Sequence, residues 1–295
     1  MKSKHSHYVF FVTIVLLMAA CDKQKAPQPS GPPVRVVSTS PSITEMMFAL
    51  GAGDRLVGVT DYCTYPPEAR EIAKIGGIIN PSLEAIVALH PDLVVLGNLN
   101  AAFRAKLEAL NIPFLMFPEN TIADILNNIQ LLADRLGEPE RGRQLVQRIE
   151  NNMATIRQGL DNKQRREVMF VVGRTPGTVN DIYVVGQRAF LSDLIEMAGG
   201  KNAFGDLAQQ YAKVSKEEIL ARAPEIILES THGQNLTVAG QAEMRRTWSA
   251  LGYLPAVRNR QIYFLNDDYL LIPGPRFVQT LKKLTTILRV ENSDD

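Results

Sequence analysis

Short runs of apolar residues alternate with stretches of helical periodicity through the first third of the chain. Four of these runs are expected to form strands: 35–38, 55–60, 92–97 and 113–117. Helices are expected between them through residues 45–50, after Ser82 and over residues 101–110, with Ser42 or Thr44 as the cap of the first. Short strands that alternate with helices are typical of parallel α/β architecture, and we predict an α/β fold.

The pattern changes in the middle of the chain, where two amphipathic helices are expected in succession. Apolar residues recur along them at helical spacing: Ile125, Ile129, Leu132, Leu136, Leu145, Ile149, Met153, Ile156 and Leu160. The second helix has Pro139 in its first turn, and at 1.5 Å per residue it would be about 33 Å long. A new series of strands and helices starts with residues 166–173. We therefore interpret 138–163 as a helix that connects two lobes, 34–137 and 164–295.

One segment occurs twice, once in each expected lobe. SLEAIVALHPDLVV spans 82–95 and SKEEILARAPEIIL spans 215–228, with Ser, Glu, Ile, Ala and Pro at matching places. Serine is a favoured N-cap, and the helix dipole favours a carboxylate in the first turn, so capping explains an acidic residue near each start. Capping does not explain why Glu84 and Glu217 both stand two residues after the serine. From the residues alone, capping and a shared functional role both remain open.

The first residues have the features of an export signal. A basic start precedes an apolar run over 8–18, which is followed by two alanines and Cys21. The run is shorter than the roughly 20 apolar residues that a membrane-spanning helix needs. A cysteine directly after two alanines resembles a bacterial lipoprotein signal, which implies a lipidated Cys21; a plain signal peptide or an uncleaved anchor is the alternative. We thus expect 1–21 to be a signal peptide, 22–33 to be a flexible tether, and the folded part to lie outside the cytoplasm.

Composition and motifs narrow the function classes. The chain has 32 basic and 31 acidic residues, so it lacks the basic excess expected of a nucleic-acid-binding protein. It contains no G-x-S-x-G, no P-loop and no dinucleotide fingerprint after a strand. Of its four histidines, His5 and His7 lie in the signal, which gives no convergent set of ligands for a bare metal ion. These features disfavour an enzyme, and the two-lobe pattern disfavours a tethered structural protein.

Long motifs of the chain resemble the solute-binding proteins of bacterial ABC importers for cobalamin, haem and iron–siderophore complexes. They are RVVSTSPSITEMMFALGAGDRLVGVTDYCTYPPEA (35–69), GGIINPSLEAIVALHPDLVV (76–95), VSKEEILARAPEIIL (214–228) and PGPRF (273–277). The cobalamin-binding members are the most similar. The resemblance implies a monomer with two α/β lobes, mostly parallel sheets, one long rigid helix between them, and a ligand cleft. It also implies that Glu84 and Glu217 dock onto arginines of a permease dimer that carries ATPase subunits.

The resemblance implies a large organic metal complex as the transported ligand, with no intrinsic cofactor and no catalytic residue. Pocket positions of the cobalamin-binding members fall on Tyr62, Tyr183, Tyr211 and Asp268, and a cobalamin-like corrinoid is therefore expected. Two positions differ from that pattern: GGII stands where some members have a tryptophan, and Ile272 stands where some have a basic residue. Haem, with Tyr62 or Tyr211 as its iron ligand, and ferric siderophores remain alternatives.

Three other residues have chemistry that would suit a site. TWSALGYLPAV around Trp248 is typical of core packing, and Arg276 at a helix start is expected to have a structural role. Cys63 is expected to be a free, half-buried thiol, because lipidation of Cys21 leaves it without a partner. Among the tyrosines, Tyr62 is the strongest candidate, since it lies in a loop that leaves a strand, where the ligand clefts of α/β proteins form.

Overall fold

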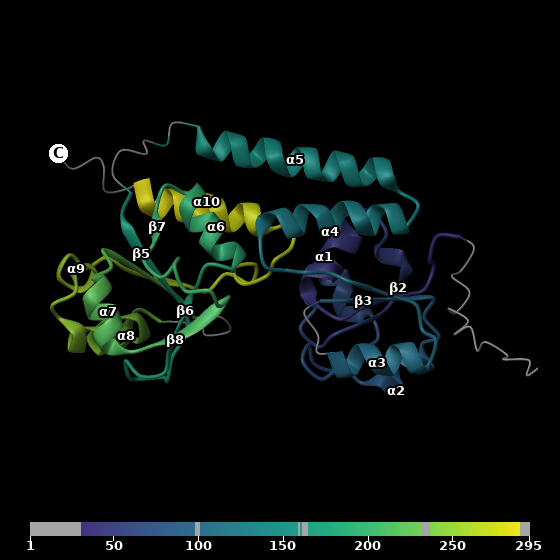
Figure 1. Ribbon diagram of the computed structural model, residues 1–295, viewed down its shortest axis with the longest axis horizontal. Helices are drawn as coiled ribbons and strands as arrows, with labels where there is room; N and C mark the ends of the chain where they lie inside the picture. Colours follow the sequence, from purple (N-terminus) through teal and green to yellow (C-terminus); the bar gives the residue numbers. More distant parts are fainter. Residues whose placement is uncertain (1–30, 98–100, 159, 161–164, 232–236, 290–295) are drawn as a thin grey trace, which may run out of the picture.

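The computed structural model describes residues 31–97, 101–158, 160, 165–231 and 237–289. Its strands are β1 Val36–Ser38, β2 Leu56–Val59, β3 Leu93–Leu96, β4 Phe114–Met116, β5 Glu167–Gly173, β6 Ile182–Val185, β7 Lys201–Asn202, β8 Tyr211–Val214, β9 Ile226–Ser230 and β10 Ile262–Leu265. Its α-helices are α1 Pro41–Ala49, α2 Leu83–Ala88, α3 Ala101–Ala109, α4 Ile122–Arg135, α5 Pro139–Arg157, α6 Phe190–Met197, α7 Lys216–Arg222, α8 Val238–Trp248, α9 Pro255–Arg258 and α10 Phe277–Arg289. Figure 1 shows two sheets side by side, each covered by helices.

The N-terminal sheet has the parallel arrangement that the sequence predicts. Its strand order is β2-β1-β3-β4, and every pair in it is parallel. Strand β3, LVVL, is apolar throughout and buried, as expected for a central strand with helices on both faces. Residues of α1 and α4 pack on one face of this sheet, and residues of α2 and α3 pack on the other. We call this sheet with α1–α4 the N-terminal lobe.

The C-terminal sheet is mixed, and its antiparallel part was not predicted. Its order is β10-β9-β5-β6-β8, with β7 also paired to β5. The pairs β10–β9, β9–β5 and β5–β7 are parallel, whereas β5–β6 and β6–β8 are antiparallel. Strands β6 (IYVV) and β8 (YAKV) have only four residues each, and only β8 alternates between exposed and buried positions. Their antiparallel pairing depends on tertiary contacts that no local pattern reveals. We call this sheet with α6–α10 the C-terminal lobe.

Helix α5 lies along both lobes, as the sequence analysis expects of a connecting helix. In Figure 1 it extends above α4 of the N-terminal lobe and α10 of the C-terminal lobe, and it packs against both. One apolar core continues across this region, with Met46 of α1, Ile129 of α4, Leu145 of α5, Leu194 of α6 and Leu281 of α10 among its buried members. The lobes therefore share part of their core. No helix in the described part of the chain combines the length and apolar character that a membrane crossing requires.

The duplicated segment starts in the same way in both lobes. Ser82 is the N-cap of α2 and accepts a hydrogen bond from the Ala85 N–H at 3.1 Å. Ser215 is the N-cap of α7 and accepts a hydrogen bond from the Glu218 N–H at 3.1 Å. Only the second copy has a capping box, because the Glu218 carboxylate accepts a hydrogen bond from the Ser215 N–H. Ala85, at the matching place in the first copy, has no side-chain acceptor.

The duplicated segment also ends in the same way. His90 and Ala223 both have a φ of 45°, in the left-handed region, directly before a proline. A left-handed residue followed by proline terminates a helix and turns the chain into the next strand. The acidic residue that follows, Asp92 or Glu225, accepts hydrogen bonds from the backbone at the start of the neighbouring strand, β1 or β5. The repeat in the sequence is thus a repeated helix–strand unit in the fold.

The start of α1 differs from the prediction. Its N-cap is Ser40, and Pro41 occupies the first turn. Ser42 and Thr44, which were expected as caps, lie inside the helix and are buried. Pro41 explains the difference, because its fixed φ and missing N–H suit the first helical position. The Ser42 hydroxyl instead donates a hydrogen bond to the buried carboxylate of Glu119, in the segment after β4.

The capping box at the start of α4 provides a stability prediction. Thr121 Oγ1 accepts a hydrogen bond from the Asp124 N–H at 3.1 Å, and Asp124 Oδ2 accepts one from the Thr121 N–H at 3.0 Å. Replacing Thr121 with Ala removes the first acceptor, so we expect the free energy of unfolding to fall by about 1 kcal/mol in urea titrations. Thr155→Ala, which removes an exposed hydroxyl within α5, should change it by less than about 0.5 kcal/mol. Equal losses would contradict the capping role.

Candidate functional site

The loop after β2 carries the first predicted ligand residue, Tyr62. Its side chain is 62% exposed, and its ring lies near Gly77, where an added Cβ would be 4.0 Å from the ring Cε2. The neighbouring Cys63 is a free thiol, with its Sγ 3.2 Å from Thr44 Oγ1 and 3.1 Å from Thr60 Oγ1. Cys63 is fully buried, whereas the sequence analysis expected it half-buried, because it packs beneath the loop against α1. Because the buried Cys63 anchors the loop, the exposed Tyr62 ring is held in place, which lowers the entropy cost of ordering it against a bound molecule.

Two further predicted residues, Tyr183 and Tyr211, lie on the antiparallel pair β6–β8. Tyr183 pairs with Lys213, and Val185 pairs with Tyr211. This register places the two tyrosines on one face as diagonal neighbours, a relation that typically separates residues by about 7–8 Å. They are 44% and 37% exposed. The opposite face of the pair is buried in the core: Ile182, Val184, Ala212 and Val214.

Tyr211 faces a buried carboxylate from the segment after β4. Gln210 Nε2 donates a hydrogen bond to the backbone oxygen of Glu119 at 3.3 Å, which brings the start of β8 against that segment. The Glu119 side chain is buried and accepts hydrogen bonds from the hydroxyls of Ser40 and Ser42. Partial withdrawal of the Tyr211 ring from water and the nearby Glu119 carboxylate raise the pKa of Tyr211 to about 12. The Tyr211 hydroxyl therefore stays protonated at neutral pH and can donate a hydrogen bond.

Asp268, the fourth predicted ligand residue, is exposed but already has a partner. Arg276 Nη1 donates hydrogen bonds to Asp268 Oδ1 at 3.0 Å and Oδ2 at 3.1 Å. The other nitrogens of the same guanidinium, Nε and Nη2, bond to Glu45 Oε2 at 3.0 Å and Oε1 at 2.6 Å. The Tyr65 ring lies against this guanidinium, with its centroid 3.7 Å from Cζ. Arg276 thus has the structural position that the sequence analysis expected.

Glu45 and Tyr65 of this cluster were not predicted from the sequence. Glu45 is only 4% exposed and lies on α1, which is otherwise mostly apolar. Burial raises the pKa of Glu45, although the hydrogen bonds and the charge of Arg276 act in the opposite direction. A charged residue within an apolar helix signals a buried partner. The sequence offered that signal but could not identify Arg276 as the partner, because the two are 231 positions apart.

The two repeated glutamates lie where the sequence analysis placed them, in the first turns of α2 and α7. Glu84 and Glu217 are both exposed. Hydrogen bonds from the Glu217 backbone N–H and the Ser215 side chain lower the pKa of Glu217, so this carboxylate is ionised at neutral pH. Each lobe therefore presents one carboxylate at an equivalent place on its surface. This arrangement suits a partner with two matching cationic sites.

Two of the residues considered in the sequence remain, Trp248 and Cys21. Trp248 is fully buried, as predicted, and its Nε1 donates a hydrogen bond to Glu229 Oε2 at 2.7 Å. Cys21, the predicted lipidation site, lies outside the described residues. Within the described ranges, no three His, Cys, Asp or Glu side chains are grouped as a metal site requires.

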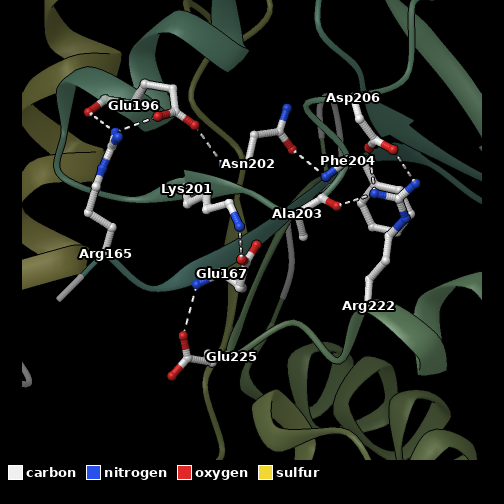
Figure 2. A network of polar contacts seen from close by, with 10 residues as sticks. All are labelled: Arg165, Glu167, Glu196, Lys201, Asn202, Ala203, Phe204, Asp206, Arg222 and Glu225. Atoms are coloured by element: carbon white, nitrogen blue, oxygen red, sulfur yellow. Dashed lines mark hydrogen bonds and ion pairs between the residues drawn. The ribbon is translucent and has the colours of Figure 1, made fainter.

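A pocket of about 500 Å³ lies away from these residues, around the starts of β5 and β7. Three ion pairs line it, and Figure 2 shows each cation directed at its carboxylate: Arg165–Glu196, Lys201–Glu167 and Arg222–Asp206. Because each of these charges has a partner within the pocket wall, we interpret the cluster as structural, with Lys201–Glu167 as the ion pair that joins β7 to β5.

Comparison with known proteins identifies the family. The family model described as periplasmic binding protein matches residues 36–269. A vitamin B12-binding protein from Vibrio parahaemolyticus is 29% identical over 253 residues, which cover 85% of this chain and 87% of that protein. The match extends from β1 of the N-terminal lobe into the loop after β10 of the C-terminal lobe.

Solved structures agree with this result. The periplasmic vitamin B12-binding protein BtuF of Vibrio cholerae superposes with a TM-score of 0.76 at 28% identity, covering 89% of this chain and 99% of that one. The periplasmic heme-binding protein RhuT from Roseiflexus sp. RS-1, in apo form, superposes with a TM-score of 0.73 at 30% identity, covering 86% and 97%. Both lobes are therefore matched in sequence and in architecture, and the chain belongs to the periplasmic binding protein family.

Proposed function

We propose that this chain is the solute-binding component of an ABC importer and that it captures a cobalamin-like corrinoid between its lobes. The observation that carries the proposal is the position of the exposed tyrosines beside the contacts that join the lobes. Tyr211 lies next to Glu119, whose backbone oxygen accepts a hydrogen bond from Gln210 of the C-terminal lobe. Tyr62 is three residues before Tyr65, whose ring covers the Arg276 guanidinium. Flat organic metal complexes bind against aromatic walls with a few polar groups that fix their orientation. The similarity to vitamin B12-binding proteins supports a corrinoid.

Each candidate residue has a distinct part in this proposal. Tyr62 and Tyr183 provide aromatic contact area from opposite lobes, since they are 62% and 44% exposed. Tyr211 donates a hydrogen bond from its protonated hydroxyl. Asp268 accepts hydrogen bonds from polar groups at the edge of the ligand, and its contact with Arg276 fixes its direction. In this proposal the domains are 34–137 and 164–295, with 138–163 as the connecting helix.

Haem is the second candidate ligand, and the similarity to a heme-binding protein favours it. A tyrosine that ligates iron must lose its hydroxyl proton. The pKa of Tyr211 at about 12 opposes this loss, so Tyr62 is the better candidate for an iron ligand. Ferric siderophores belong to the same alternative, since they are also bulky iron complexes.

The proposal includes a membrane-anchored location outside the cytoplasm. Cys21 would carry the lipid, 22–33 would form the tether, and the chain would act as a monomer. Glu84 and Glu217 would dock onto arginines of a permease dimer, one on each lobe. Growth of cells with labelled palmitate tests the anchor, because Cys21→Ser should abolish incorporation of the label while Cys63→Ser should not.

Titration of the purified protein with cyanocobalamin and, separately, with haemin tests the ligand class. We expect a saturable change in the visible spectrum with cyanocobalamin. Tyr62→Ala should weaken binding about tenfold, since loss of an aromatic contact costs on the order of 1.5 kcal/mol. Tyr253→Ala is the matched control, because Tyr253 is 90% exposed in the C-terminal lobe outside the predicted site. Saturation with haemin alone would replace the corrinoid by haem, and saturation with neither would contradict both.

A further inference from the structure

A buried ion pair joins the two lobes. Arg276, just before α10 of the C-terminal lobe, bonds through two nitrogens to both oxygens of Glu45 in α1 of the N-terminal lobe, at 3.0 Å and 2.6 Å. Their side chains are 11% and 3% exposed. A bidentate pair between a guanidinium and a carboxylate fixes orientation as well as distance. It is also screened little by salt when it is withdrawn from water.

The surroundings of the pair leave little room for movement. The Tyr65 ring covers one face of the Arg276 guanidinium at 3.7 Å, in the geometry of a cation–π contact. The backbone of the C-terminal lobe comes close to α1 at Gly274, where an added Cβ would be 3.2 Å from Glu45 Oε2 and 3.3 Å from the Ser42 Cα. The two lobes therefore meet in direct contact at this point.

Two weaker contacts lie along the same junction. Gln210 Nε2 donates to the Glu119 backbone oxygen at 3.3 Å, and the Ile122 N–H donates to Asp193 Oδ2 at 3.0 Å. Both join the segment around the start of α4 to the C-terminal lobe. Of these three contacts, the Glu45–Arg276 pair is the one between two full charges, so it contributes the largest electrostatic energy.

We propose that Arg276 is a positioning residue that fixes the angle between the lobes through Glu45 and directs Asp268 toward the ligand. Separation of the lobes would leave Arg276 paired with Asp268, which belongs to its own lobe. Glu45 would be left without its cation, and an unpaired carboxylate in this buried position is costly. The protein is thereby held in one lobe arrangement before any ligand binds. The part that concerns Asp268 rests on the proposed function, whereas the lobe angle does not.

The distance between the lobes tests this proposal without any ligand. Spin labels at Glu71→Cys and Arg258→Cys, exposed positions on opposite lobes, report that distance by pulsed electron paramagnetic resonance. The full-length chain carries Cys21→Ser, and the buried Cys63 remains inaccessible to the label. The parent should give one narrow distance distribution. Glu45→Gln, which keeps the shape and removes the charge, should add a second, longer population.

Two control variants separate this effect from general damage to the fold. Glu229→Gln makes the same change in a buried pair within the C-terminal lobe, Arg174–Glu229, and should leave the lobe distance unchanged while lowering the melting temperature. Asp268→Asn should also leave the distance unchanged, because Asp268 lies on the same lobe as Arg276. A single, unchanged distance in folded Glu45→Gln overturns the proposal, and so does a longer distance in Glu229→Gln. If Glu45→Gln does not fold, Arg276→Lys, which lacks the planar guanidinium, is measured instead. A single, unchanged lobe distance in that variant overturns the proposal.

Ligand binding provides the second readout. When only a fraction of the molecules has the binding-competent arrangement, the apparent affinity falls by that fraction. If Glu45→Gln retains the fixed arrangement in about a tenth of the molecules, its apparent affinity for the probe, cyanocobalamin, should fall about tenfold. An unchanged affinity together with a second lobe distance would overturn the link to the ligand site. Absence of cyanocobalamin binding by the parent would count against the proposed function and leave the distance result intact.

Discussion

Reversing the charges of Glu84 and Glu217 together is expected to reduce uptake of labelled cobalamin by cells at least about 100-fold. Truncating one partner of a hydrogen-bonded charge pair that is buried in a protein interface costs about 2–5 kcal/mol, and two such pairs with the permease would be lost here with repulsion added. Glu84→Lys and Glu217→Lys both lie in exposed first helical turns, where a cation opposes the helix dipole by only about 0.3–1 kcal/mol. The variant should therefore stay folded and bind cyanocobalamin within about twofold of the parent.

A matched control separates docking from a general effect of charge. Glu68→Lys with Glu150→Lys reverses two other exposed carboxylates, on the 3-10 helix Pro67–Glu71 and on α5. This variant carries the same net charge and should support normal uptake. Normal uptake by the Glu84 and Glu217 variant would refute the docking role. Equal loss in both variants would show that the total charge, and not these positions, governs uptake.

The repeat explains why so much of the fold could be predicted from the sequence. Ser82 and Ser215 mark helix starts, and Pro91 and Pro224 mark the turns into strands, because caps and prolines act through local geometry. The connecting helix was predicted within 138–163, and α5 occupies Pro139–Arg157 of that range. Element ends depend on weak local preferences and are the least predictable part of a helix.

The parts of the site that were missed depend on contacts between distant segments. Tyr183 and Tyr211 were named as candidates, but the antiparallel pair that places them on one face was not predicted, because strand pairing in β6 and β8 is set by tertiary contacts. The link from Asp268 through Arg276 to Glu45 joins residues that no local pattern relates. Local chemistry predicts which side chains are unusual, and the fold decides which of them meet.

The buried pair Arg174–Glu229 is expected to be the position where one substitution lowers stability most. Arg174 Nε donates to Glu229 Oε1 at 2.7 Å, and Trp248 Nε1 donates to Glu229 Oε2 at 2.7 Å. The side chains of Arg174 and Glu229 are 4% and 5% exposed. Arg174→Met leaves the carboxylate buried with the indole N–H as its partner. Removing one member of a buried ion pair costs about 3–5 kcal/mol, which is a large part of a typical stability of about 5–15 kcal/mol.

Substituting both residues shows whether the unpaired charge of Glu229 causes the loss of stability in Arg174→Met. Arg174→Met with Glu229→Gln removes both charges and keeps an acceptor for the Trp248 N–H, so most of the lost stability should return, because a buried pair exceeds an uncharged replacement only slightly. Arg143→Met is the control, since its pair with Glu140 is 61% and 63% exposed and should contribute less than about 1 kcal/mol. Urea unfolding of Arg174→Met, Glu229→Gln, the double variant and Arg143→Met, with the parent as reference, measures these free energies. A double variant as unstable as the sum of its single changes would show that packing of the Arg174 side chain, and not its charge, stabilises the C-terminal lobe.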